Sequence, residues 1–351
     1  MPMRKAGAPG GRCAMLAGVS RQDAGPEGPR GDRMDFGFSI PHRGPLANPA
    51  DQKRLAQTGE RLGYAALTVS DHIVIPRDIE SKYPYSETGD FPGSRSGEAL
   101  EMIALLAFLC GVTEKARLIT SVMVLPHRNP VLAAKQLATA DILSGGRVTV
   151  GCGVGWMREE FEAVGLPPFD ERGRVADEYL RVFKAVWTGD PASFAGDYAG
   201  FSNVSTLPHP VQKPHPPLWI GGESMPALRR VVGLGDAWYP IGNNPRAMLD
   251  SLDRYRARRD LLFRTAEAAG RDPSTIGLAY SAPWHFEEAA DDGAGGRRFL
   301  TGSAQERAGD LRALGELGVS CVFLNFAARS IERTEDRLSR FAEEVAPLLG
   351  S

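Results

Sequence analysis

Residues 145–161 read GGRVTVGCGVGWMREEF, an apolar run in which Gly151, Gly153 and Gly155 precede a helix-like segment. Glycines between a strand and a helix are typical of dinucleotide sites, where a pyrophosphate rests on the helix N-terminus. That arrangement requires G-x-G-x-x-G and an acidic residue on the next strand about 20 residues later. Here the spacing is G-x-G-x-G, and no second strand follows promptly. The stretch therefore disfavours a Rossmann domain and leaves two uses for the glycines, a tight turn or the close approach of a flat ligand.

On both sides of this stretch, short β-branched runs alternate with amphipathic helical segments, the pattern of parallel βαβ units. Eight such rounds follow Met34, and eight is the count of a (β/α)8 TIM barrel. The alternative is a pair of doubly wound domains, but the sequence shows no linker segment that would separate two domains. The expected strands span 35–40, 65–70, 116–124, 147–153, 216–222, 236–241, 275–282 and 319–326.

Two long irregular stretches interrupt the alternation, residues 73–97 after the second strand and residues 189–214 before the fifth. Loops of this length are uncommon in compact domains and are often functional. In a barrel the first lies on the C-terminal face, which carries the active site. We expect it either to cover a substrate or to be a decorative insertion.

Composition excludes several classes of protein. The chain has 351 residues and a net charge of -2, so it has no basic field to recruit nucleic acid or an anionic membrane. No segment reaches the roughly 18 uninterrupted apolar residues of a membrane helix. The four cysteines, at 13, 110, 152 and 321, lack metal-site spacing, which favours free thiols in the cytoplasm and no metal. Residues 1–33 are rich in Gly, Pro and Arg and lack the apolar core of a signal peptide, so we expect disorder there and one domain over 34–351.

The stretch from 145 to 189, GGRVTVGCGVGWMREEFEAVGLPPFDERGRVADEYLRVFKAVWTG, strongly resembles the luciferase-like monooxygenase family, especially its deazaflavin-dependent oxidoreductase branch. The resemblance continues through TVSDHIVIP, LITSVMVLPHRNPVLAAKQLATADILSGGR, VQKPHPPLWIGGES and LGDAWYP, and so covers roughly Met34 to Trp238. It implies a TIM barrel of the bacterial luciferase type that binds coenzyme F420, or alternatively FMN, in its mouth. The glycines would then leave room beside the flavin.

The resemblance also implies site residues. Asp71 and His72 follow the second strand, and the resemblance places His72 near the reactive carbon of the cofactor, with Asp71 in the cofactor site. An imidazole can donate or accept a proton near neutral pH, as carbonyl or alcohol redox chemistry requires. The alternative is that the two residues cap a turn. His127 and Trp156 are expected to line the substrate pocket, although Trp156 could simply pack the helix, and Arg128 is expected to anchor the next helix.

Further cofactor contacts are expected on three strands. The resemblance implies a bulge with a non-proline cis peptide at Ser121–Val122, behind the flavin ring. The turn IGGES precedes a helix whose first turn contains Pro226, and free N–H groups at such a helix start bind phosphate. Alternatively, Ser224 is only the helix N-cap, whereas in the phosphate site Glu223 would contribute its backbone rather than its charge. The expected cofactor contacts, besides Asp71, are Ser121, Val122, Gly153, Gly221, Gly222, Glu223 and Ser224.

We therefore expect an oxidoreductase that transfers a hydride between F420 and a small organic substrate. An FMN-dependent monooxygenase and a non-catalytic flavin-binding barrel are the alternatives. Deazaflavin sugar-phosphate dehydrogenases carry an acidic proton donor at the end of the fourth strand, and its nearest match here is Val154. The expected substrate is therefore more apolar than a sugar phosphate, and the expected assembly is a homodimer.

Overall fold

Eight parallel strands close into a barrel in the order β1-β10-β9-β8-β7-β4-β3-β2. The computed structural model describes residues 34–350 apart from 95, 285–286 and 294, so the expectation for residues 1–33 lies outside the described residues. Every expected strand is present, which confirms the predicted (β/α)8 fold. The barrel strands are β1 (Asp35–Ser39), β2 (Ala66–Val69), β3 (Arg117–Val124), β4 (Val148–Gly153), β7 (Leu218–Gly221), β8 (Ala237–Tyr239), β9 (Gly277–Ala282) and β10 (Val319–Leu324).

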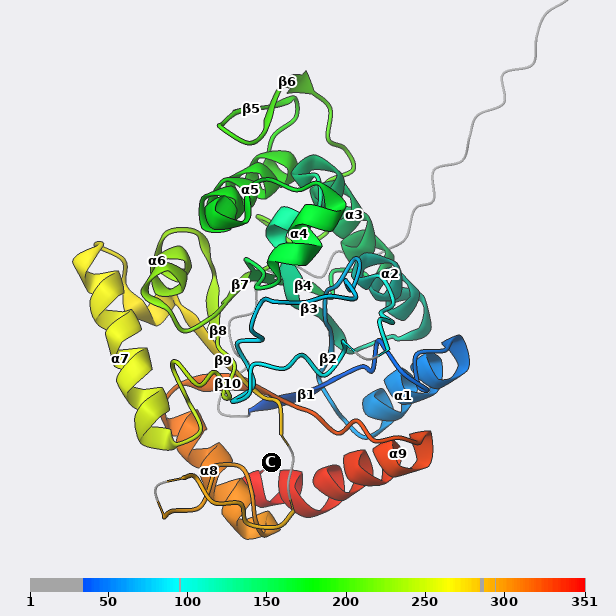
Figure 1. The fold of residues 1–351 in the computed structure, drawn as a ribbon, viewed down its shortest axis with the longest axis vertical. Coiled ribbons are helices and arrows are strands. Elements are labelled where there is room, and N and C mark those ends of the chain that lie inside the picture. The colour runs from blue at the N-terminus through cyan, green and yellow to red at the C-terminus, as the bar shows by residue number, and fades with distance from the viewer. Residues whose placement is uncertain (1–33, 95, 285–286, 294, 351) are drawn as a thin grey trace, which may run out of the picture.

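Helices surround this barrel (Figure 1). Three of them have a proline in the first turn, preceded by a capping side chain, Asn48, Asn129 or Ser224, that accepts a backbone N–H. Such caps satisfy donors that have no partner inside the helix. The outer helices are α1 (Pro49–Arg61), α2 (Met102–Val112), α3 (Pro130–Leu143), α5 (Arg172–Thr188), α6 (Met225–Leu234), α7 (Leu252–Ala268), α8 (Ala304–Glu316) and α9 (Ile331–Arg340).

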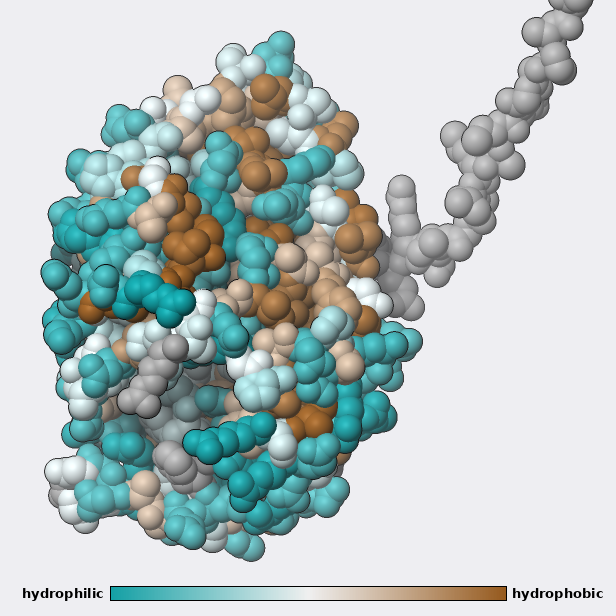
Figure 2. Space-filling model, turned by 45° about the vertical axis from the view of Figure 1, so that its right-hand side comes forward, coloured by the Kyte–Doolittle hydropathy of each residue, from teal (hydrophilic) through white to brown (hydrophobic). Residues whose placement is uncertain are grey.

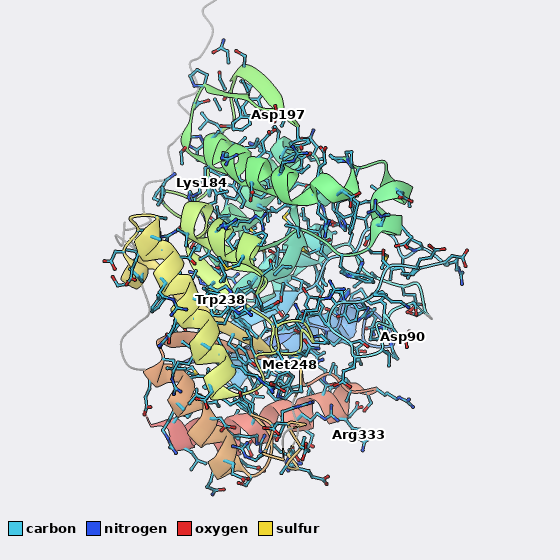
Figure 3. All side chains as sticks on the ribbon, turned by 60° about the vertical axis from the view of Figure 1, so that its left-hand side comes forward. Asp90, Lys184, Asp197, Trp238, Met248 and Arg333 are labelled. Carbon is cyan, nitrogen blue, oxygen red and sulfur yellow. The ribbon has the colours of Figure 1, made fainter. Side chains whose placement is uncertain are left out.

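The apolar core has two parts. The larger part lies between strands and helices and includes Trp238 of β8, which stacks on Tyr255 of α7 with ring centroids 5.3 Å apart and lies behind that helix in Figure 3. The smaller part fills the barrel itself and includes Ile119, Tyr239 and Phe323. The barrel is therefore packed with side chains, as expected for eight strands. Cys110, Cys152 and Cys321 are buried free thiols, as predicted.

The two irregular segments leave the barrel at opposite ends of its strands. The first insertion follows β2 and so lies at the C-terminal ends of the strands, where Figure 1 shows it crossing in front of them beside α4 (Arg158–Val164). The second insertion leaves α5 at the N-terminal ends of the strands and forms the hairpin of β5 (Ala192–Ala195) and β6 (Gly200–Val204). The turn of this hairpin bonds to Glu178 near the start of α5, so the hairpin runs back along the outside of that helix. A third long connection, from 283 to 303, was not predicted. No described helix is long and apolar enough to span a membrane.

Candidate active site

A bulge in β3 occupies the mouth of the barrel. Thr120 pairs with Val150 and Met123 with Cys152, so Ser121 and Val122 together stand opposite Gly151 alone. The peptide bond between Ser121 and Val122 is cis. Both features of the predicted bulge are thus confirmed.

The glycines of β4 accommodate this bulge. A Cβ atom on Gly151 would lie 2.0 Å from the carbonyl oxygen of Thr120, and one on Gly153 would lie 2.5 Å from Cγ2 of Val122. Gly155 has φ +82°, a conformation that favours glycine. The space beside Gly151 and Gly153 is filled by protein atoms, whereas the family resemblance implied that it would face a cofactor. A contact between Gly153 and the cofactor stays a prediction.

Tyr239 supports the bulge from inside the barrel. Its phenolic oxygen lies 2.9 Å from the hydroxyl oxygen of Ser121. Burial raises the pKa of Tyr239 well above its usual value, although hydrogen bonds with Ser121 and Ser281 partly offset this. Tyr239 is therefore a neutral hydroxyl at the mouth. Sequence reasoning missed it, although it belongs to an expected strand on which alternate residues face the barrel interior.

A buried carboxylate holds His72. Oε2 of Glu160 lies 2.9 Å from Nδ1 of His72, and Oε1 accepts the backbone N–H groups of Ile73 at 2.7 Å and Val74 at 3.3 Å. Glu160 is only 1% exposed. A carboxylate on Nδ1 fixes the orientation of the ring and leaves Nε2 for another partner. Sequence reasoning missed Glu160, which lies in α4 and reads there as an ordinary helix residue.

Two further histidines are buried nearby. Nδ1 of His127 lies 4.0 Å from Oε1 of Glu160 and has no hydrogen-bond partner within the described chain. Burial lowers the pKa of His127, although Asp71 and Glu160 oppose the shift. Burial also lowers the pKa of His42 to about 4, with smaller contributions from Arg43 and His72. Both imidazoles are therefore neutral near pH 7.

The Asp71 carboxylate bonds to neighbouring groups of the protein. It forms a two-pronged ion pair with Arg128 at 2.7 Å for each contact, and Oδ2 also accepts the backbone N–H of Val124 at 2.9 Å. Arg128 in turn pairs with Glu101 at 2.6 Å. These contacts match the alternative in which Asp71 holds the turn and Arg128 anchors the following helix. A cofactor contact of Asp71 stays a prediction.

Residues 156–160, which follow β4, also hold the first insertion over the mouth. Oε1 of Glu159 accepts the backbone N–H groups of Glu80 at 2.8 Å and Ser81 at 2.9 Å. The Trp156 ring packs against Tyr83 and Phe91, with centroids 5.1 and 5.3 Å apart. The predicted position of Trp156 at the mouth fits this cluster of rings, and its role in binding substrate stays a prediction.

The turn between β7 and α6 lies next to the bulge. A Cβ atom on Gly221 would be 3.1 Å from Cγ1 of Val122, and Gly222 has φ +104°. The hydroxyl of Ser224 accepts the N–H of Ala227 at 3.4 Å, so Ser224 is the N-cap of α6. The backbone N–H groups at the start of α6, before Ala227, have no partner inside the helix. They are therefore suited to bind an anion.

The side chain of Glu223 points away from this helix start. Its carboxylate accepts the N–H of Ile241 at 2.9 Å and the side-chain amide of Asn244 at 2.8 Å. Its carbonyl oxygen accepts a hydrogen bond from Arg258 at 2.9 Å. The carboxylate therefore anchors the loop after β8, which agrees with the expectation that its charge does not serve a phosphate site.

The predicted site residues thus gather at the C-terminal ends of adjacent strands. His72, His127 and Trp156 lie on one side with Glu160, while Ser121, Val122, Gly153 and Gly221 surround the bulge. Among residues 34–350, apart from the gaps noted above, no cluster of His, Cys, Asp or Glu could hold a metal ion.

Known proteins resemble this chain in sequence and in fold. An uncharacterized protein of Mycobacterium tuberculosis is 34% identical over 237 residues, which cover 68% of this chain and 74% of that protein. An FMNH2-dependent dimethylsulfone monooxygenase of Pseudomonas putida is 33% identical over 208 residues, which cover 59% of this chain and 52% of that protein. The coenzyme F420-dependent tetrahydromethanopterin reductase of Methanopyrus kandleri has the same fold, with a TM-score of 0.68 at 15% identity over 90% of this chain and 99% of the reductase.

The family described as luciferase-like monooxygenase matches residues 34–337, which include the whole barrel. Its members are oxidoreductases and monooxygenases. On this match and on the shared barrel, the chain belongs to the luciferase-like monooxygenase family and is an enzyme of that class.

Proposed function

We propose that this enzyme transfers a hydride between coenzyme F420 and a small organic alcohol or carbonyl compound. The observation that carries the proposal is His72 at the mouth of the barrel, held by the buried carboxylate of Glu160 at 2.9 Å. Hydride transfer to or from a carbon that bears oxygen requires a proton to move at that oxygen. A histidine fixed by a carboxylate is suited to that task.

The residues at the mouth fit a flavin-type cofactor. The bulge at Ser121–Val122 lies beside Gly221 and offers a surface for a flat ring. The start of α6 at Ser224 offers free N–H groups for a phosphate. We propose that these residues, with Gly153, Gly222 and the backbone of Glu223, hold the cofactor. When bound, F420 supplies a hydride acceptor or donor.

The chain's own residues supply the proton transfer. Nε2 of His72 accepts the proton of an alcohol O–H as the alcohol becomes a ketone, or returns it to the carbonyl oxygen in reverse. Glu160 stabilises the imidazolium that forms in the first direction. The rings of Tyr83, Phe91 and Trp156 pack against one another in and beside the first insertion, where we expect them to exclude water from the reaction.

FMN-dependent oxygenation is the second candidate. It is supported by the 33% identity to an FMNH2-dependent monooxygenase. The same aromatic cover would serve this chemistry, because excluding water prevents side reactions of reactive intermediates.

The test combines cofactor titration with one substitution. Purified protein is assayed with F420 and 1-phenylethanol, and with reduced F420 and acetophenone, by following the absorbance of F420. We expect His72→Asn to lower kcat by about 10²- to 10⁴-fold while the Kd for F420 changes little. His215→Asn is the matched control, because His215 precedes β7 at the opposite end of the barrel and bonds to the carbonyl of Pro216. Full turnover by His72→Asn, or oxygen-dependent turnover with reduced FMN alone, would exclude the proposed reaction.

We also propose that the enzyme is a cytoplasmic homodimer. The dimer is supported by exposed apolar side chains on α3 and on the loop after β6: Leu132 (55% exposed), Leu143 (64%), Leu207 (54%) and Val211 (52%). Figure 2 shows apolar patches on one face of the molecule. The side chain of Lys135 bonds to the carbonyl of Leu207, so helix and loop form one surface. Sedimentation at several concentrations tests the assembly, and a monomer at all of them would exclude it.

A further inference from the structure

We propose that Arg43 binds the carboxylate of an apolar, ring-bearing organic acid and so makes this enzyme selective for anionic substrates. This inference rests on the proposed function, because it places the anion beside the same mouth that His72 serves.

Arg43 lies in the loop after β1, at the C-terminal end of the barrel, and is half-buried. Its guanidinium carbon is 5.1 Å from the centroid of the Phe91 ring. The first insertion is shaped around it, since a Cβ atom on Gly93 would lie 2.3 Å from Nη1 of Arg43 and 2.6 Å from the Phe91 ring. Glycine at this position lets the backbone pass close to the guanidinium.

The Arg43 side chain forms no hydrogen bond or ion pair in the part of the chain that the structure describes. The carboxylates at the mouth are engaged elsewhere, Asp71 by Arg128, Glu160 by His72, and Glu159 by backbone N–H groups. Asp90 of the same insertion is exposed and projects at the edge of the molecule in Figure 3. In the described part of the chain, the positive charge of Arg43 therefore rests against the Phe91 ring and has no anionic partner.

An unpaired, partly buried cation is costly, and an incoming anion removes that cost. Burial lowers the pKa of Arg43, and only Tyr83 opposes the shift. A guanidinium also offers a planar fork that matches a carboxylate, which an ammonium group does not. These properties favour a carboxylate over a neutral polar group.

Phe91 connects this cation to the proposed chemistry. Its ring centroid lies 5.0 Å from that of His72, so at most about 10 Å separates the His72 ring from the guanidinium carbon. The same ring contacts Tyr83 and Trp156, at 5.3 Å each. Phe91 is itself buried, whereas Tyr83 and Trp156 beside it are half-buried. A molecule that pairs with Arg43 would therefore lie against Tyr83 and Trp156 on its way to His72. Such a surface selects an apolar ring next to the carboxylate.

The test measures charge preference without turnover. Isothermal titration calorimetry of the full chain, with F420 present, compares 2-naphthoate with its neutral amide 2-naphthamide. We expect the wild-type protein to bind the acid at least about tenfold more tightly. Arg43→Gln should bring the two Kd values within about threefold, and Arg43→Lys should keep part of the preference.

Arg264→Gln is the matched control, since Arg264 is an exposed arginine of α7 outside the mouth. It should retain the full preference. Equal binding of acid and amide by the wild-type protein, no binding of the acid, or an unchanged preference in a folded Arg43→Gln protein would overturn the inference. Failure of the proposed function would give a different result. In that case the wild-type protein would not bind F420 when it is titrated with F420 alone, without naphthoate.

Discussion

Replacing Ser224 by aspartate tests the phosphate site while sparing the fold. Ser224 is exposed and caps α6 by accepting the N–H of Ala227. Asp and Asn are N-caps about as good as Ser, so either variant should retain the helix. Asp adds a negative charge that the helix dipole stabilises by about 0.3–1 kcal/mol. Ser224→Asn is therefore a neutral control with the same cap.

The expected loss of affinity follows from the distance between two charges. An aspartate at the cap and a phosphate on the neighbouring N–H groups would be about 4 Å apart, where two unit charges repel by about 4 kcal/mol at an effective dielectric constant of 20 and about 1 kcal/mol in water. Because Ser224 is exposed, we expect a value in the lower half of this range. That corresponds to a cofactor Kd raised about five- to seventyfold.

Fluorescence titration with F420 and with FMN measures the effect, and thermal unfolding checks the fold. Ser224→Asp should bind the cofactor at least about fivefold more weakly than Ser224→Asn while unfolding at the same temperature or higher. Equal affinities in the two folded variants would place the phosphate elsewhere. Gly222 is a poorer position for this test, since its φ of +104° strains any other residue.

Three further predictions follow from the packing and charges at the mouth. Glu160→Gln should lower kcat about ten- to a hundredfold without changing the F420 titration, because His72 loses its counter-charge, and an unchanged kcat would refute this role. Gly151→Ala should lower the free energy of unfolding in urea by at least about 1–3 kcal/mol, whereas Gly309→Ala in α8, where a Cβ meets no atom within 4 Å, should raise it by up to about 1 kcal/mol. Because the pKa of His42 is lowered from 6.5 to about 4 on folding, its stabilisation is present above pH 6.5 and is lost, by about 3 kcal/mol, as pH falls towards 4. Urea unfolding across this range should show a smaller loss in His42→Gln, and an equal loss would contradict the assignment.

The sequence was sufficient to predict elements that depend on local patterns. Strand runs, prolines in first helical turns and the cap at Ser224 all follow from neighbouring residues, and the structure contains each. The bulge at Ser121–Val122 was predicted only through family resemblance, because nothing in its local residues distinguishes it from a regular strand.

Contacts between distant segments could not be predicted in the same way. Glu160 and His72 are 88 residues apart, and only closure of the barrel and the path of the first insertion bring them together. Likewise, Gly151 and Gly153 signal a close approach, but the sequence does not say whether a ligand or another strand approaches. Here the β3 bulge fills that space.

Equilibrium titration of the full chain with F420, followed by F420 fluorescence and repeated with FMN, tests most directly whether this mouth binds a flavin-type cofactor for hydride transfer. We expect saturable binding of one F420 per chain, tighter than that of FMN and weakened by Ser224→Asp. Absence of binding by either cofactor, or binding of FMN alone, would contradict it.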